Sequence, residues 1–164
     1  YYEFVKPIEN ILKINGIKFI TRHYTKIKKE DLLNSKKIII CGTSLKDNYF
    51  LKDIKKFSWI KNINKPVLGI CAGMQIIALL YEGKLKKFTE IGFYNENFKE
   101  FLGIKNKQQV YHLHNNYISL PNGFEQFNKG KIPQAIKHKT KSIYGVLFHP
   151  EVRQKNLIIN FIKK

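Results

Sequence analysis

The spacing of hydrophobic residues in the first half of the chain alternates between helical and strand-like patterns. Apolar side chains recur every three or four positions across residues 3–15, which predicts an amphipathic helix. Residues 17–24 are expected to form a strand. Uninterrupted apolar runs at 37–41 and 66–70 predict strands buried on both faces, and a short helix is expected between them at 51–59.

The second half continues this alternation and adds short β-like segments. A helix is predicted at residues 72–81, and the chain closes with a buried strand at 143–148 and a helix at 157–163. Shorter strands are expected at 83–88, 110–114, 117–120 and 134–137. Alternating helices and buried strands are typical of an α/β fold. We therefore expect a three-layer sandwich with a mostly parallel central sheet, flanking helices and a small antiparallel β portion.

The composition is that of a folded domain. Of the 164 residues, 43% are hydrophobic, which is enough for one core. No apolar run approaches the length of a membrane span, and the first residues lack the features of a signal peptide. The two cysteines, Cys41 and Cys71, are too few for a disulfide scaffold, so a reducing, cytoplasmic compartment is expected.

The formal net charge of +18 raises the question of an acidic partner, such as nucleic acid, an anionic membrane or an acidic protein. All basic residues other than Arg22 and Arg153 are lysines, which are spread along the chain, and no nucleic-acid-binding motif is present. Nucleic-acid readers usually rely on arginine. A biased composition explains the charge better, so we expect neither nucleic acid nor membrane as a partner; an acidic protein partner remains open.

A sharp turn with a central cysteine follows the predicted strand at 66–70. Residues 69–73 read Gly-Ile-Cys-Ala-Gly, and the glycines allow a nucleophile elbow between strand and helix. The helix N-terminus would favour the thiolate of Cys71, and the backbone N–H of Ala72 would donate to an oxyanion. The turn alone is equally compatible with a buried cysteine that only packs the helix on the strand.

A histidine at the end of the last predicted strand suggests a catalytic partner for this cysteine. Open α/β sheets place their sites at this edge, where His149 lies. A cysteine followed by a distant histidine suits a thiol nucleophile and its base. Pro150 favours an extended residue before it, so Glu151 would lie on the same side as His149 and fix its tautomer.

Together, the two motifs resemble those of the class I (triad) glutamine amidotransferases. The matching stretches are residues 69–75, which read GICAGMQ, and 144–151, which read YGVLFHPE. Within that family, residues 120–125 and 135–141 are most similar to the glutaminase subunit of GMP synthase, and the later stretch is also similar to that of anthranilate synthase. The resemblance runs from about Phe4 to the end of the chain and implies a flavodoxin-like fold.

The resemblance implies hydrolysis of L-glutamine to glutamate and ammonia. Cys71 would attack the side-chain amide to form a γ-glutamyl thioester, His149 would act as general base and then acid, and Glu151 would orient His149. Ammonia would pass to an ATP-dependent synthetase, for example to make GMP from XMP. No metal or organic cofactor is implied for this half-reaction, since ATP and Mg²⁺ would belong to the synthetase. The implied oxyanion and substrate-binding residues are Gly42, Thr43, Ala72, Gln75, Gly92 and His114.

The chain departs from the family pattern in several places. The oxyanion loop reads CGTSLKD at 41–47, where the family usually has Gly-Gly-Pro. Residues 111–117 keep His114 but differ after it, which weakens the GMP synthase assignment more than the glutaminase one. The family's first strand is not seen, so the single domain expected at residues 1–164 would begin with a strand upstream of them. The pair His112 and His114 suits metal, but no further ligand has suitable spacing, so no metal site is predicted.

Other functions remain open from the sequence. A stand-alone hydrolase of a γ-glutamyl or related amide would work without a partner, and a glutaminase subunit could serve another synthase, such as anthranilate synthase. A non-catalytic binding module is disfavoured because Cys71, His149 and Glu151 are all intact.

Overall fold

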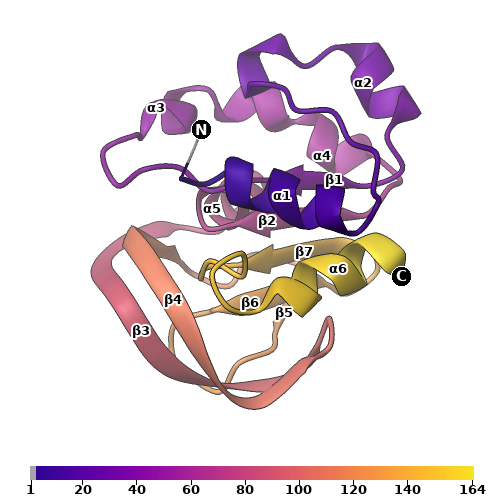
Figure 1. Cartoon of the computed structure of the whole chain (residues 1–164). Coiled ribbons are helices and arrows are strands. Elements are labelled where there is room, and N and C mark those ends of the chain that lie inside the picture. The colour runs from indigo at the N-terminus through magenta and orange to yellow at the C-terminus, as the bar shows by residue number, and fades with distance from the viewer. Residues whose placement is uncertain (1–2) are drawn as a thin grey trace.

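A mixed five-stranded sheet lies at the centre of the structure, a computed structural model that describes residues 3–164 (Figure 1). Its first three strands run parallel, β6 is antiparallel to its neighbours, and β5 returns to the common direction. The strand order is β1 (Ile38–Ile40), β2 (Val67–Ile70), β7 (Ile143–Val146), β6 (Ala135–His138) and β5 (Phe124–Gln126). The expected mostly parallel sheet is therefore confirmed.

Helices cover both faces of this sheet (Figure 1). Helices α1 (Lys6–Ile14) and α6 (Lys155–Lys163) pack on one face, and α5 (Ala72–Leu80) packs on the other. Strand β2 shows why three layers form, because successive side chains of a strand point to opposite faces. Leu68 faces the α1 and α6 side, whereas Val67 faces α5, and both are fully buried.

A long hairpin forms the small antiparallel portion beside the sandwich (Figure 1). Its strands are β3 (Leu85–Phe101) and β4 (Ile104–Ile118). An isolated two-stranded hairpin is only marginally stable in water. Here Phe98 and Phe101 are buried in the core cluster of α1 and α6, and the Phe98 ring lies 5.5 Å from that of Phe148. These contacts hold the hairpin against the sandwich.

Two predictions of local structure are wrong. The strand expected at residues 17–24 does not form: residues 17–23 have no regular structure, and a short 3-10 helix, η1, follows at Tyr24–Lys26. Ile20 is 56% exposed and no neighbouring strand supplies hydrogen bonds, so strand-like composition alone does not suffice. The helix expected at 51–59 is split into the pieces α3 (Tyr49–Lys52), η2 (Ile54–Phe57) and α4 (Trp59–Asn62).

The short strands expected at 83–88, 110–114 and 117–120 belong to the one hairpin. Its outer part was missed because residues 91–109 are rich in Lys, Asn and Gln and show little of the β-branched content typical of strands. The short helix α2 (Lys29–Asn34) and the edge strand β5 (Phe124–Gln126) also went unpredicted. Among residues 3–164, no helix is long and apolar enough to span a bilayer.

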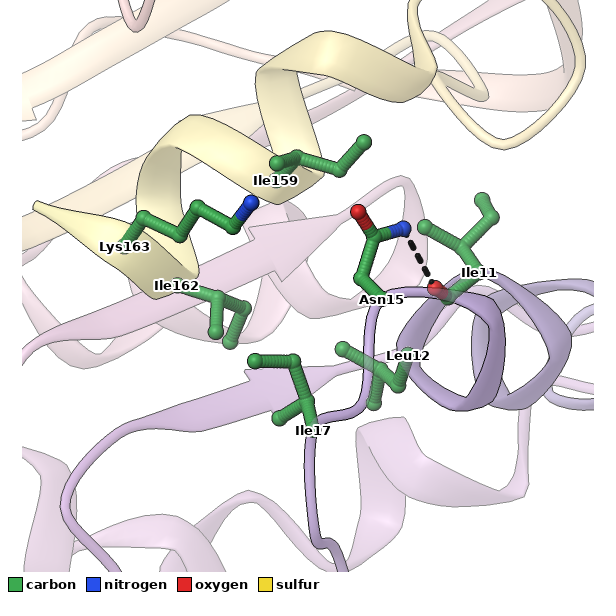
Figure 2. Close-up of a pocket in the computed structure, with 7 residues that line it drawn as sticks. All are labelled: Ile11, Leu12, Asn15, Ile17, Ile159, Ile162 and Lys163. Carbon is green, nitrogen blue, oxygen red and sulfur yellow. Dashed lines mark hydrogen bonds between the residues drawn. The ribbon is translucent and has the colours of Figure 1, made fainter.

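A shallow apolar notch separates the two terminal helices (Figure 2). Asn15 closes the last turn of α1, where its Nδ2 donates to the Ile11 carbonyl at 2.8 Å. The lining residues are Ile11, Leu12, Asn15, Ile17, Ile159, Ile162 and Lys163. This lining offers no nucleophile or acid–base pair, so the chemistry of the chain lies elsewhere.

Candidate active site

The turn between β2 and α5 holds Cys71 in a strained backbone conformation. Its φ of 52° and ψ of −104° lie outside the regions that residues with a side chain favour. Two hydrogen bonds fix this conformation: Cys71 N donates to Val146 O at 2.8 Å, and Cys71 O accepts from Gln75 N at 3.1 Å. The sharp turn expected from the Gly-x-Cys-x-Gly motif is therefore present.

The glycines on either side of Cys71 are required by close packing. A Cβ on Gly69 would lie 2.5 Å from the Gly73 carbonyl, and a Cβ on Gly73 would lie 2.2 Å from Ile40 O. The first residues of α5 can thus pass directly over the ends of β1 and β2. This brings the Cys71 side chain to the edge of the sheet where the parallel strands end.

His149 and Glu151 form a buried hydrogen-bonded pair just beyond β7. His149 Nδ1 lies 2.8 Å from Glu151 Oε1, and both residues are buried. The backbone N–H of His149 donates to Tyr111 O at 2.9 Å, which ties the histidine to β4. The bond to Glu151 occupies Nδ1, so Nε2 is the ring nitrogen left for proton transfer, as in a catalytic triad.

Cys71 and His149 are electrostatically coupled. Burial alone would lower the pKa of His149, but the neighbouring Cys71 and the hydrogen-bonded Glu151 raise it to about 10. The His149 ring is therefore protonated at neutral pH. Burial, with the charges of Glu151 and Glu9, raises the pKa of the other thiol, Cys41, to about 12. Cys41 therefore stays protonated and unreactive at neutral pH.

Gly42 lies between Cys71 and His149. A Cβ built on it would be 2.9 Å from His149 Cε1 and 3.3 Å from Cys71 Cβ. The loop beyond Gly42 is braced internally, because Thr43 Oγ1 donates to Asp47 Oδ2 at 2.8 Å. The loop, whose sequence differs from the family pattern, is therefore held by a hydrogen bond between two of its own side chains.

A recess opens beside Cys71 and encloses about 280 Å³ of empty space, part of it open to solvent. Four residues expected around a substrate line it: Thr43, Ala72, Gln75 and His114. Further lining residues were not foreseen from the sequence: Ser44, Leu45, Asp47, Asn48, Phe50, Leu113, Asn115 and Asn116. Gly92 does not line the recess. It lies on β3 opposite His112, with a φ of +112° and open space beside it.

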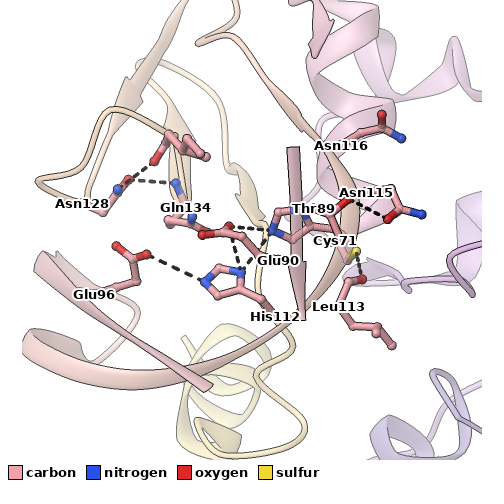
Figure 3. Close-up of polar contacts among 12 residues, drawn as sticks. Cys71, Thr89, Glu90, Glu96, His112, Leu113, Asn115, Asn116, Asn128 and Gln134 are labelled. Carbon is pink, nitrogen blue, oxygen red and sulfur yellow. Dashed lines mark hydrogen bonds and ion pairs between the residues drawn. The ribbon is translucent and has the colours of Figure 1, made fainter. Parts of the chain in front are cut away.

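Residues near the end of β4 lie beside Cys71 (Figure 3) and line this recess. The Cys71 thiol lies 3.6 Å from Leu113 O, and Gln75 Nε2 donates to Asn116 O at 3.1 Å. Cys71 is only 4% exposed as a result. These backbone carbonyls were missed because their positions depend on how the hairpin folds over the elbow, which residue identity does not reveal.

His114 belongs to a buried polar cluster as well as to the wall of the recess. Its Nε2 lies 2.9 Å from Glu90 Oε2 and 3.2 Å from His112 Nδ1. Burial, followed by the charge of His112, lowers the pKa of His114 to about 4, so its ring is neutral at physiological pH. The premise that no third potential ligand accompanies the two histidines is wrong, because Glu90 reaches them from the opposite strand.

A family model and several curated proteins are similar to this chain. The family model described as Glutamine amidotransferase class-I matches residues 1–163. The glutamine-hydrolyzing GMP synthase of Spiroplasma kunkelii is 37% identical over 153 residues, which cover 84% of this chain and 29% of that protein. The corresponding enzyme of Staphylococcus saprophyticus is 33% identical over 159 residues, which cover 87% and 30%. The chain thus spans less than a third of the length of these relatives.

Solved structures share its architecture. A Thermoplasma acidophilum protein, provisionally described as one of the subunits of a GMP synthase, has a TM-score of 0.88 at 25% identity, covering 96% of this chain and 86% of that one. A glutamine amidotransferase from Thermotoga maritima has a TM-score of 0.71 at 19% identity, covering 91% and 71%, which supports the fold alone. The expected flavodoxin-like arrangement is confirmed.

Proposed function

Because the chain belongs to the class I glutamine amidotransferase family, we propose that it hydrolyses the side-chain amide of L-glutamine to glutamate and ammonia. One observation carries the proposal: Cys71 at its strained elbow and the hydrogen-bonded pair His149–Glu151 meet around Gly42. A thiol, a base and a group that orients the base are the three parts that such a reaction needs.

The first half of the reaction forms a thioester. The Cys71 sulfur attacks the amide carbon, and the resulting oxyanion accepts hydrogen bonds from the backbone N–H of Ala72 and from the loop at Gly42 and Thr43. His149 Nε2 gives its proton to the amide nitrogen as the C–N bond breaks, and ammonia leaves. Glu151 holds the ring through Nδ1 throughout.

The second half regenerates the thiol. His149, now neutral, takes a proton from water as the water oxygen attacks the thioester carbon. The C–S bond breaks, glutamate leaves, and the proton returns to the Cys71–His149 pair. No step requires a metal or an organic cofactor.

The ammonia acceptor is proposed from the relatives. Both curated relatives are glutamine-hydrolyzing GMP synthases several times longer than the matching stretch. We therefore assign to this chain the ammonia-supplying role for an ATP-dependent synthetase that converts XMP to GMP, with ATP and Mg²⁺ bound by the synthetase. The unpaired cysteines suit a cytoplasmic setting.

Labelling with a thiol-directed glutamine analogue tests the glutaminase assignment. Mass should be added at Cys71 and not at Cys41, and Cys71→Ala should abolish glutamate release while the fold is retained. Cys41→Ala is the matched control and should keep the activity. Modification at Cys41 instead would refute the assignment.

A second assay tests the acceptor. Glutamate release is measured with and without the synthetase part of a GMP synthase, in the presence of ATP, Mg²⁺ and XMP. Stimulation and formation of GMP are expected. If only a different synthetase stimulates the chain, the GMP assignment fails while the glutaminase assignment stands; high activity without any partner would indicate a stand-alone hydrolase.

A further inference from the structure

Three potential metal ligands meet inside the β3–β4 hairpin (Figure 3). In the register of the hairpin Glu90 pairs directly with His114, and His112 lies two residues away on the same strand face. All three side chains are buried. This cluster, Glu90–His112–His114, comes together only through the pairing of the two strands.

The three ligand atoms are spaced as a bound ion requires. Glu90 Oε2, His112 Nδ1 and His114 Nε2 form a triangle with sides of 2.9, 3.2 and 3.7 Å. Ligands about 2.0–2.1 Å from a tetrahedral Zn²⁺ lie about 3.3 Å from one another. The triangle therefore needs shifts of only a few tenths of an ångström to become one face of such a tetrahedron.

The three ligand atoms find their polar contacts within the cluster itself. His114 Nε2 makes a hydrogen bond with His112 Nδ1 at 3.2 Å and lies 2.9 Å from Glu90 Oε2, and among residues 3–164 no hydrogen bond of good geometry reaches Glu90 Oε2. Buried polar groups are normally paired, because leaving them unpaired is costly. A cation at the centre of the triangle would bind a lone pair of each of the three atoms at once.

A fourth residue lies near the outer nitrogen of His112. Glu96 Oε1 lies 3.8 Å from His112 Nε2, the ring nitrogen that points away from the triangle (Figure 3), which is too far for a hydrogen bond. Metal-bound histidines usually donate their second ring N–H to a carboxylate, which fixes the tautomer. A shift of Glu96 toward the ring would form this bond and leave Nδ1 of His112 free to bind the ion.

From this geometry we infer that Glu90, His112 and His114 bind one divalent transition-metal ion, with Zn²⁺ as the best fit. Two imidazoles and one carboxylate are a donor set typical of Zn²⁺, and a water completes the tetrahedron. Glu90 and Glu96 supply local negative charge in a chain whose net charge is +18.

The position of the site suggests what the ion does. It would join β3 to β4 next to the register shift between Lys87 and Glu90. Leu113, between the two histidines, contacts the Cys71 thiol through its carbonyl. The ion would thus fix the strand that forms one wall of the recess, as a positioning element and not as a participant in the reaction.

Metal titration of the whole chain, stripped with a chelator, tests this inference. Zn²⁺ is titrated by calorimetry, and Co²⁺ by its visible absorption. One ion per chain is expected, with intense tetrahedral Co²⁺ bands and without a sulfur charge-transfer band. Zn²⁺ should also raise the melting temperature of the wild type, because only the folded hairpin assembles the ligands.

Variants locate the ion. His112→Gln and Glu90→Gln should each weaken binding at least ~100-fold, and Glu96→Gln should weaken it about 10- to 100-fold. The matched controls are His23→Gln and Glu125→Gln, which change exposed residues outside the cluster and should leave the affinity unchanged. Melting of each metal-free variant separates lost binding from lost folding.

Three results would overturn the inference. Binding that survives both His112→Gln and Glu90→Gln would place the ion elsewhere. A sulfur charge-transfer band that vanishes in Cys71→Ser would place it at the thiol. If the wild type binds Zn²⁺ no more tightly than a variant that carries both His112→Gln and Glu90→Gln, the cluster is only a hydrogen-bonded network.

Discussion

At the scale of single residues, the backbone of Cys71 is held in a strained conformation. Such a conformation costs a residue with a side chain about 1–3 kcal/mol, and hydrogen bonds to Val146 and Gln75 help to hold it there. Glycine adopts this conformation freely but loses about 0.5–1 kcal/mol of chain entropy. The balance between these two effects can be measured.

We predict that Cys71→Gly has a higher free energy of unfolding than Cys71→Ala, by about 1 kcal/mol. Urea denaturation of the two variants, both inactive, gives this difference directly. If the alanine variant proves the more stable, the turn is not strained.

Gly42→Ala should disturb the base without unfolding the protein. The new Cβ would lie 2.9 Å from His149 Cε1 and push the ring aside. Misplacement of a catalytic group by about 1 Å typically costs about 100-fold in rate, so kcat for glutamate release should fall by about that factor. Gly130→Ala, whose Cβ would meet its nearest neighbour at 3.3 Å, is the control with near-normal kcat.

The pKa of His149, raised from 6.5 to about 10, makes stability depend on pH. When the pKa of a group is higher in the folded than in the unfolded state, protonation of that group stabilises the fold. The stabilisation is complete at pH values below the unfolded-state pKa, and it is lost as the pH rises through the folded-state pKa. Glu151→Gln removes one cause of the raised pKa. The stability difference between wild type and Glu151→Gln should therefore be largest near pH 6.5 and shrink towards pH 10.

Urea unfolding at several pH values measures this trend. A difference that grows between pH 6.5 and 10 would contradict the direction assigned to the pKa of His149.

Sequence patterns located the residues that follow strands, because a buried apolar run marks a strand and its end marks the sheet edge. Cys71 and His149 were found in this way. Glu90 and Leu113 were not, since their roles depend on the register between β3 and β4, which no spacing along the chain encodes. The family resemblance placed Gly92 near the substrate, but the structure places it outside the recess.

At the scale of elements, the hairpin depends on a few aromatic anchors. Phe98 is 2% exposed and packs on Phe148, whereas Phe93, on the same strand, is 53% exposed. Phe98→Ala should lower the free energy of unfolding by about 3–5 kcal/mol. Phe93→Ala should change it by less than about 1 kcal/mol. Equal effects in urea denaturation would mean that the hairpin is not anchored at Phe98.

The buried parallel strands of the sheet were predictable and the hairpin was not. Buried strands such as β2 can be recognised in the sequence by their uninterrupted apolar residues. The outer part of the hairpin is half exposed and polar. Its strands pair through the backbone ladder between β3 and β4, which leaves no hydrophobic pattern in the sequence. The opposite error at residues 17–24 has the same origin, since strand composition without a pairing partner gives no strand.

At the scale of the whole molecule, the net charge of +18 destabilises the folded state by repulsion between like charges. With 30 basic and 12 acidic residues, repulsion outweighs attraction. Raising NaCl from about 20 mM to about 500 mM shortens the Debye length to a few ångströms. The melting temperature should therefore rise by at least ~2 °C. An uncharged osmolyte of equal osmolarity serves as the control, and a fall in melting temperature with salt would show that the surface ion pairs dominate.

The contacts of β4 have a mechanical consequence. The carbonyl of Tyr111 accepts a hydrogen bond from the backbone N–H of His149, and that of Leu113 lies against the sulfur of Cys71. Both belong to a long arm whose other end is pinned by Phe98 and Phe101. A displacement of the hairpin would therefore move Cys71 and His149 together. A protein docked on the hairpin would slow turnover in this way without contacting glutamine.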